Sequence, residues 1–274
     1  MNFEALTQST LNIRKRILDM SLESGASTHL GGGLSIVEIL TYLYAHELNY
    51  NLTNPTWESR DRFILSKGHG VLGFYATLRE YNFLSEKQIK TFMKNESELI
   101  AHPIMNPSNG IESSNGSLGH GLSFGVGLAW AAKYKLEKNR VFVLLGDGEC
   151  NEGSIWEAAM SASQLGLDNL IAIVDINGLQ NDGLTSEILD PGKMELKWQS
   201  FGWDNHLIDG NSLYDIHRVF STIKPNAKPV VILANTVKGK GVDFMENNNR
   251  WHHNRLTKTQ YDSAIVSLIK SAND

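Results

Sequence analysis

Two apolar runs that each end beside an oxygen-bearing side chain place the strongest constraint on the fold of this chain. The run at 141–145 ends next to Asp147, which glycines flank on both sides, and the run at 170–174 leads to Asn177, thirty residues after Asp147. Short apolar runs bounded by glycine and polar residues are typical of buried strands in a parallel sheet. Because the carboxyl ends of parallel strands open on one crevice, Asp147 and Asn177 are predicted to face the same ligand.

A carboxylate and an amide oxygen form the sparse ligand set that Mg²⁺ uses, because this ion keeps water and completes its coordination with phosphate oxygens. The pair therefore predicts a phosphorylated ligand. Gly146 and Gly148 allow backbone N–H groups to approach such phosphates, and a helix predicted from Glu152 would direct its positive end toward them. The alternative is structural: Asp147 caps a helix and Asn177 begins an ordinary turn.

Composition excludes several classes of function. The chain has 274 residues, is 41% hydrophobic and carries a formal net charge of −5, and its 25 lysines and arginines are scattered, so nucleic acid is not an expected partner. The single cysteine, Cys150, excludes an internal disulfide and a cysteine-based metal cluster. No run approaches the roughly 18 apolar residues of a membrane span, and the amino terminus lacks a signal-peptide pattern. We therefore expect a cytoplasmic protein without a membrane partner.

Helices and strands are predicted to alternate along the chain. This alternation indicates an α/β fold with a central parallel sheet and helices on both faces. No repeat or linker divides the chain, so we expect one domain over residues 1–274. The predicted helices are 4–23, 36–48, 71–81, 85–94, 122–136, 152–165, a segment that ends at 201, 212–223 and 258–271, and the predicted strands are 61–65, 141–145, 170–174, 206–210 and 229–235.

Two histidines lie in glycine-rich segments that come before predicted helices. His29 belongs to the stretch 24–33, which contains too much glycine for regular structure and is expected to be a loop, with Ser35 capping the helix that follows. His69 lies between Gly68 and Gly70 after a strand, where its ring is predicted to meet a phosphate. A plain surface histidine is the alternative for His29, but three consecutive glycines favour close approach of a ligand.

Gly68, Gly70 and Gly73 also fit the dinucleotide fingerprint G-x-G-x-x-G. That fingerprint requires an acidic residue about twenty positions later at the end of a second strand, whereas 85–94 has the pattern of a polar helix. The nucleotide interpretation is therefore set aside.

A long irregular connection, 99–121, carries His102, Gly116 and Leu118. Long loops inside a compact domain are commonly functional. The helix predicted after it is crowded with glycine and alanine, which suits close packing either in the core or at a subunit boundary.

The segment 146–183, GDGECNEGSIWEAAMSASQLGLDNLIAIVDINGLQNDG, resembles the thiamine diphosphate signature and is similar to transketolases. The resemblance extends over nearly the whole chain and rests on six segments in order. The other five are the glycine-rich loop of His29, LSKGHG at 65–70, AHP at 101–103, GSLG at 116–119 and KGKG at 238–241.

The resemblance implies a role for each matched residue. Asp147, Asn177 and the carbonyl of Leu179 are expected to hold Mg²⁺ or Ca²⁺, His29 and His102 to bind the oxygens of a donor sugar, and Glu157 to lie at a subunit interface. His69 and a histidine of the pair His252–His253 are expected beside the diphosphate or the substrate, with His252 favoured. The residues assigned to thiamine diphosphate are His69, Gly116, Leu118, Gly146, Asp147, Gly148, Glu149, Asn177, Lys238 and His252, and those assigned to catalysis are His29, His69, His102 and His252.

A full-length transketolase continues with a pyrimidine-binding domain, whose glutamate activates the cofactor, and with a third domain, whereas this chain ends at Asp274. The resemblance therefore implies the amino-terminal subunit of a split enzyme that transfers a two-carbon ketol unit between sugars. A second polypeptide is expected to supply the remaining domains in a heterotetramer of two of each chain.

Three departures from the family pattern bear on the substrate. Thr28-His29-Leu30 replaces glycine-histidine-proline, His120 stands where glutamine is common, and His253 takes the place of a glycine. They are compatible with a donor or acceptor outside the pentose pathway. Two alternatives stay open, namely a related thiamine diphosphate synthase subunit of specialised sugar metabolism and a cofactor-binding regulatory subunit without catalysis.

Overall fold

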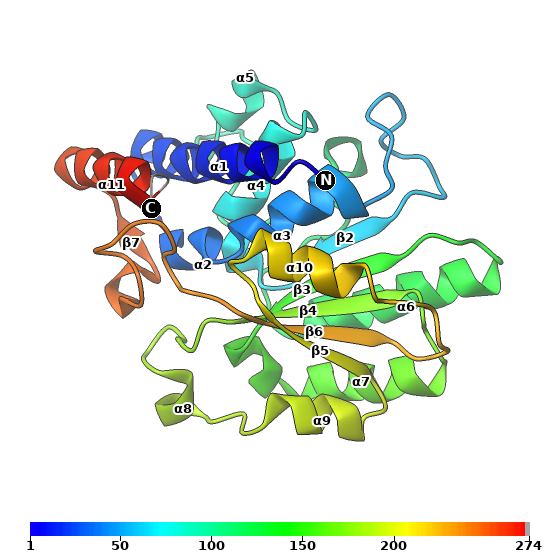
Figure 1. The fold of residues 1–274 in the computed structure, drawn as a ribbon. Helices are drawn as coiled ribbons and strands as arrows, with labels where there is room; N and C mark the ends of the chain where they lie inside the picture. The colour runs from blue at the N-terminus through cyan, green and yellow to red at the C-terminus, as the bar shows by residue number, and fades with distance from the viewer. Residues whose placement is uncertain (272–274) are drawn as a thin grey trace.

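A five-stranded parallel sheet forms the centre of the molecule (Figure 1). The structure is a computed structural model that describes residues 1–271. The order of the strands is β2-β3-β4-β6-β5, so β5 lies at one edge and pairs with the later strand β6. The α/β fold and the five strands predicted from the sequence are confirmed. The strands are β2 (Arg62–Leu65), β3 (Val141–Gly146), β4 (Leu170–Ile176), β5 (Asp204–Asp209) and β6 (Val230–Asn235).

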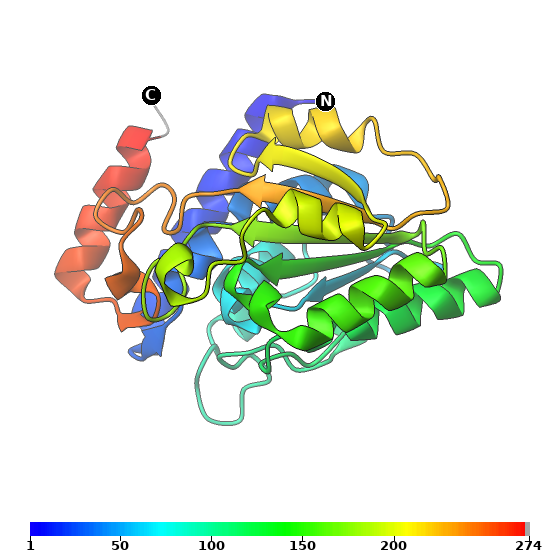
Figure 2. The same ribbon diagram turned by 90° about the horizontal axis from the view of Figure 1, so that it is seen from below.

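Helices cover both faces of this sheet (Figures 1 and 2). One layer contains α1 (Phe3–Ser24), α3 (Val37–Tyr42), α4 (Val71–Glu80) and α10 (Leu213–Phe220), with α11 (Lys258–Ser271) packed beside α1. The opposite layer contains α6 (His120–Tyr134), α7 (Gly153–Gln164) and α9 (Met194–Ser200). The shorter elements are α2 (Leu30–Leu34), a π-helix (Leu43–Glu47), α5 (Glu86–Ile89), α8 (Thr185–Ile188) and 3₁₀ turns at Gly68–Gly70, Pro107–Asn109, Gly148–Asn151 and Asn249–Trp251.

The apolar runs of the central strands divide between two cores because side chains alternate along a strand. Phe142 and Leu144 of β3 pack against the layer of α1, α3 and α4. Val141, Val143 and Leu145 pack against the layer of α6, α7 and α9. Burial on both faces explains why these strands have no polar residue in alternate positions.

The glycine-rich segment 24–33 differs from the predicted loop, because its second half forms α2 (Leu30–Leu34). A Cβ on Gly73 of α4 would lie 2.5 Å from the carbonyl oxygen of Gly33, so the glycines allow two helices to pack backbone against backbone. Ser35 does not cap the following helix, since Ile36 occupies the N-cap position without a side-chain bond. The Ser35 hydroxyl bonds Asp175 instead.

Two further expectations about local structure are wrong. The helix expected over 85–94 is the short α5 followed by turns, although Ser85 and Gln88 form its capping box. Residues expected to be irregular form a two-stranded antiparallel sheet of β1 (Ser27–Thr28) and β7 (Asn254–Arg255). No helix among residues 1–271 is long and apolar enough to cross a membrane.

Candidate active site

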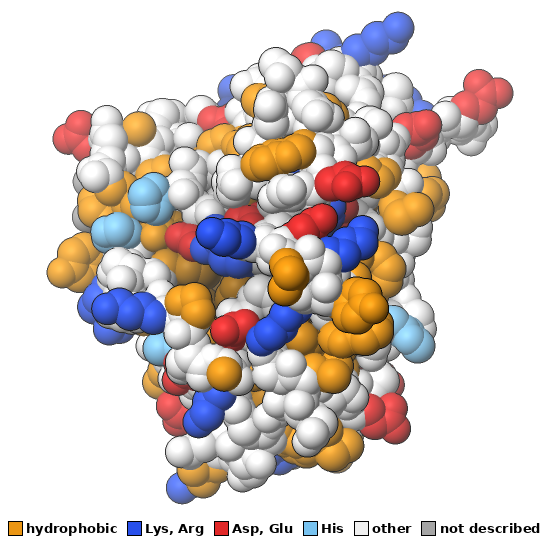
Figure 3. All heavy atoms as spheres, turned by 90° about the vertical axis from the view of Figure 1, so that its right-hand side faces the viewer, with side chains coloured by type: hydrophobic (Ala, Val, Ile, Leu, Met, Phe, Trp, Pro, Cys, Tyr) orange, Lys and Arg blue, Asp and Glu red, His pale blue; other side chains and the backbone are white. Residues whose placement is uncertain are grey.

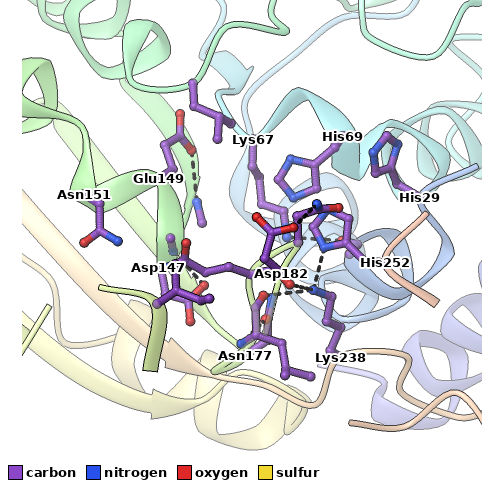
Figure 4. A pocket seen from close by; sticks show the side chains of 18 of the residues that line it. His29, Lys67, His69, Asp147, Glu149, Asn151, Asn177, Asp182, Lys238 and His252 are labelled. Atoms are coloured by element: carbon purple, nitrogen blue, oxygen red, sulfur yellow. Dashed lines mark hydrogen bonds between the residues drawn. The ribbon is translucent and has the colours of Figure 1, made fainter. Parts of the chain in front are cut away.

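A cavity of about 500 Å³ opens at the carboxyl ends of β2, β3 and β4 and beside the segment that follows β6 (Figure 4). In Figure 4, His29, His69 and His252 lie on one side of it, and Asp147, Glu149 and Asn151 lie on the other. Every residue that the sequence assigned to catalysis, cofactor or metal lines this cavity. They are His29, His69, His102, Gly116, Leu118, Gly146, Asp147, Gly148, Glu149, Asn177, Leu179, Lys238 and His252.

The loop after β4 wraps around the carboxylate of Asp147. Oδ2 of Asp147 accepts hydrogen bonds from the N–H of Gly178 at 2.9 Å and from Thr185 Oγ1 at 2.9 Å, and Oδ1 accepts one from the N–H of Gly148 at 2.8 Å. Burial, and then the neighbouring carboxylate of Asp175, raises the pKa of Asp147.

Asp147, Asn177 and Leu179 offer a set of hard oxygen donors. Asp147 accepts three hydrogen bonds with about four lone-pair positions, which leaves one for a cation. Gly178, whose N–H donates to Asp147, lies between Asn177 and Leu179, so this hydrogen bond brings the segment with both donors against the carboxylate. Oxygen donors of this type fit Mg²⁺ or Ca²⁺. No group of three or more histidine, cysteine, aspartate or glutamate side chains within the described part of the chain is arranged to hold a metal.

Asp175 is a buried junction beneath this donor set, and the sequence pattern did not single it out. Oδ2 of Asp175 accepts hydrogen bonds from Ser35 Oγ at 2.8 Å, from Asn177 Nδ2 at 3.0 Å and from the ammonium of Lys67. Its other oxygen accepts from Thr236. The Asn177 amide must donate to Asp175, so its oxygen faces away from Asp175 and accepts the N–H of Leu179 at 3.1 Å.

Lys67 supplies the countercharge for Asp175, and both side chains are almost completely shielded from solvent. The pKa of Asp175 is lowered because the neighbouring ammonium and the donated hydrogen bonds outweigh burial, although burial is the largest single influence and acts in the opposite direction. The strand position of Asp175 and the LSKGHG motif of Lys67 were the available signals. Neither signal shows that the two residues meet, because 108 positions separate them.

Glu149, which the sequence assigned to the cofactor, lines the cavity and also holds several segments of this chain together. Its carboxylate accepts hydrogen bonds from the N–H groups of Gly119 at 2.9 Å and Gly146 at 3.1 Å and from the Ser66 hydroxyl at 2.5 Å. Burial raises its pKa. Glu149 thus connects the ends of β2 and β3 and the start of α6.

Lys238 contacts both the proposed metal ligand Leu179 and the histidine cluster. Its ammonium donates to the carbonyl of Leu179 at 2.9 Å and contacts Nδ1 of His252 at 2.7 Å. Burial, and then the charge of Lys67, lowers the pKa of Lys238 to about 8. Because an ammonium only donates, Nδ1 of His252 is the acceptor and the ring proton lies on Nε2.

Five imidazole rings gather at the other end of the cavity. The centroid of the His29 ring lies 5.7 Å from that of His69, 5.9 Å from His102, 5.4 Å from His252 and 4.5 Å from His253. His252 lines the cavity and stacks on His69 at 5.5 Å, whereas His253 is exposed and does not line it. This placement favours His252 for the diphosphate-side role.

Burial keeps four of these rings neutral near pH 7. It is the largest cause in each case, and it lowers the pKa of His29 to about 4 and that of His252 to about 3. The pKa of His102 is also lowered, and that of His69 falls well below its usual value. A neutral imidazole offers one donor and one acceptor, which suits hydroxyl and carbonyl oxygens.

We expect acid to destabilise the protein through this cluster. The unfolded chain binds protons on its histidines below pH 6.5, whereas the folded His29 resists protonation down to about pH 4, so stability falls as the pH drops through this interval. His29→Asn should flatten the fall by about 1–2 kcal/mol, allowing for partial exposure of the ring. Urea unfolding between pH 7 and 4.5 measures it. His46→Asn, at an exposed histidine outside the cluster, is the control, and an unchanged slope for His29→Asn would refute the explanation.

Glu157 lies away from the cavity, on the exposed side of α7. One side of α6 packs against the core, where a Cβ on Gly125 would lie 2.6 Å from Val143. The other side of α6 is exposed to solvent. The large apolar residues on the exposed side of these two helices are Phe124, Trp130, Tyr134 and Met160.

On the face seen in Figure 3, lysine and arginine side chains are interspersed with acidic and hydrophobic ones. No continuous basic field covers that face. This agrees with the scattered positive charge of the sequence.

Comparisons with known proteins identify the family. Residues 7–266 match the family described as "Transketolase, thiamine diphosphate binding domain". The chain is 43% identical to one of the subunits of the apulose-4-phosphate transketolase of Actinobacillus succinogenes, over 98% of this chain and 97% of that one. It is 39% identical to a 6-deoxy-6-sulfo-D-fructose transketolase subunit of a Clostridium species, over 94% of each chain.

The structure of transketolase from Campylobacter jejuni superposes with a TM-score of 0.90 at 29% identity. That match covers 100% of this chain and 43% of the other, so the chain spans less than half the length of this solved relative. The chain belongs to the transketolase family, as a thiamine diphosphate-binding domain that matches separate transketolase subunits over nearly their whole length.

Proposed function

We propose that this chain is the diphosphate-binding subunit of a two-component transketolase, which moves a two-carbon ketol unit from a ketose donor to an aldose acceptor. The observation that carries the proposal is the convergence of all thirteen assigned residues on one cavity, together with the full-length match to separate transketolase subunits. A partner polypeptide with the pyrimidine-binding and third domains completes the enzyme. The single cysteine, Cys150, is a buried free thiol, which suits a cytoplasmic location.

Thiamine diphosphate is held in this proposal with Mg²⁺ or Ca²⁺. Asp147, Asn177 and the Leu179 carbonyl hold the metal, because these are the oxygen donors at the ends of β3 and β4. Gly148 and Lys238 adjoin the diphosphate, and Leu118 packs on the cofactor. When bound, the cofactor supplies the carbon nucleophile and the electron sink that ketol transfer requires.

The neutral histidines bind the sugar and the cofactor in this proposal. His29 and His102 donate hydrogen bonds to the carbonyl and hydroxyl oxygens of the donor, and His69 and His252 adjoin the cofactor. The lowered pKa values of His29 and His102 keep both rings neutral at neutral pH, so each ring has one nitrogen that donates a hydrogen bond and one that accepts. Their rings form no hydrogen bond with a described residue other than the Lys238 contact of His252, which leaves nitrogen atoms for the ligand.

The partner is proposed to cover the exposed side of α6 and α7. Large apolar side chains gather there, with Trp130 50% and Tyr134 80% exposed, and a monomeric surface rarely presents several such residues together. Glu157 lies on the same helix layer and would be enclosed by the contact. The proposed assembly is a heterotetramer of two of each chain.

The donor is proposed to be a specialised ketose. Two relatives that match over nearly their full length are named for apulose-4-phosphate and 6-deoxy-6-sulfo-D-fructose, both of which carry an anionic group. These two sugars are therefore the first donors to test, beside xylulose 5-phosphate and fructose 6-phosphate.

Reconstitution tests the proposal. We expect the chain alone to transfer no ketol units and the mixture with its partner to transfer them with a thiamine diphosphate requirement. A coupled assay with each donor measures turnover, and light scattering gives the mass of the assembly. Normal turnover by the isolated chain would exclude the two-component enzyme. Use of pyruvate in place of a ketose would indicate a synthase, and cofactor binding without turnover of any donor would indicate a regulatory subunit.

A further inference from the structure

The two-residue strands β1 and β7 place one more histidine, His253, against the ring of His29 just outside the cavity. Ser27 pairs with Arg255 and Thr28 pairs with Asn254 in antiparallel register. His29 follows β1 and His253 precedes β7, so these two histidines occupy the next cross-strand position. Side chains that face each other across an antiparallel pair interact directly. The ring centroids are 4.5 Å apart, the shortest distance from His29 to any of the four neighbouring imidazoles.

Contacts with α1 and α2 hold both strands in place. Thr28 Oγ1 lies 2.7 Å from Ser21 Oγ in a buried contact that ties β1 to α1. Trp251, two positions before His253, is 5% exposed. A Cβ on Gly31 would lie 3.1 Å from the Trp251 carbonyl oxygen, so the segment before β7 rests against α2. The position of His253 is therefore set by the fold rather than by its own side chain.

The ring of His253 is available to a ligand. It is exposed, and it forms no hydrogen bond with any residue that the structure describes. A positive charge on His253 would lower the pKa values of both His29 and His102. His253 thus borders His29, one of the two residues assigned to the donor sugar, on its exposed side, while His69 and His252 border His29 from within the cavity.

We propose that His253 is a third substrate-contacting histidine, which binds a sugar hydroxyl of the ketose donor beyond the carbonyl held by His29 and His102. The inference rests on the proposed transketolase function. An imidazole presents a donor or an acceptor to a hydroxyl at low conformational cost when the backbone already positions it. His253 therefore contributes to the choice between long, hydroxylated donors and short ones.

Two donors separate this role from a structural one. Hydroxypyruvate carries the same terminal hydroxyl and carbonyl as a ketose but none of the sugar hydroxyls that follow. In the reconstituted complex, His253→Ala should lower kcat/KM about 3- to 10-fold for the best ketose donor, which is the effect of one lost hydrogen bond. The same variant should leave kcat/KM for hydroxypyruvate unchanged. His253→Gln keeps a donor and an acceptor and should recover part of the loss.

Two outcomes would overturn the inference. Equal losses of kcat/KM for both donors would mean that His253 only supports His29. No loss for either donor would mean that His253 has no role in binding. Unchanged thiamine diphosphate affinity by calorimetry shows that the variant is folded, and His46→Ala, at an exposed histidine outside the cluster, is the matched control. If the wild-type complex turns over neither donor, the proposed transketolase function is wrong. That result is distinct from a failure of the His253 inference, which requires an active wild-type complex.

Discussion

Lys67→Met should destabilise the folded chain by about 3–5 kcal/mol, because it leaves the carboxylate of Asp175 buried without its countercharge. Both side chains are shielded, at 1% and 0% exposure. For a chain of this size the loss corresponds to a fall of roughly 10 °C in melting temperature. Urea unfolding and thermal melting of the isolated chain measure both values.

Two further variants test whether charge is the cause. Lys258→Met removes a lysine from the exposed pair with Asp262 on α11 and should cost no more than about 0.5 kcal/mol. The double variant Lys67→Met with Asp175→Asn removes both buried charges and should be more stable than Lys67→Met alone. If the single and double variants were equally unstable, lost packing of the lysine stem would explain the effect.

The sequence predicted the parts of the fold and site that depend on local pattern. Apolar runs at 141–145 and 170–174 became buried strands, and the rule that parallel strands open on one crevice correctly brought Asp147 beside the loop of Asn177. The resemblance to a split transketolase is confirmed by the family match and by the full-length match to separate subunits.

The features that the sequence did not reveal depend on contacts between distant segments. Gly33 was expected in a loop, because its local sequence does not show that its backbone packs closely against Gly73 of α4. Asp175 looked like one more strand residue, yet donors from three other segments converge on it, namely Ser35, Lys67 and Thr236. The strands β1 and β7 have two residues each, so they are too short to show the alternating sequence pattern that predicts a strand.

Asp147→Asn should weaken metal-dependent binding of thiamine diphosphate by more than about 100-fold, since loss of a residue that only orients a metal ligand already costs about 10–100-fold. The amide keeps the size of the side chain and one acceptor oxygen, so Gly178 or Thr185 retains a partner. Calorimetry of the isolated chain with the cofactor, with and without Mg²⁺, measures the affinity. Circular dichroism and thermal melting check that the variant is folded.

Asp182→Asn is the matched control for this substitution. Asp182 also lines the cavity and carries the same charge, but it is exposed, and its carboxylate accepts a hydrogen bond from the neighbouring Asn181 rather than from Gly178 and Thr185. If Asp147 acts as a metal ligand, its substitution removes the Mg²⁺ dependence, whereas Asp182→Asn leaves that dependence in place. Equal losses for the two variants would mean that the carboxylates act through the general field of the cavity, and the assignment of Asp147, Asn177 and Leu179 to the metal would be wrong.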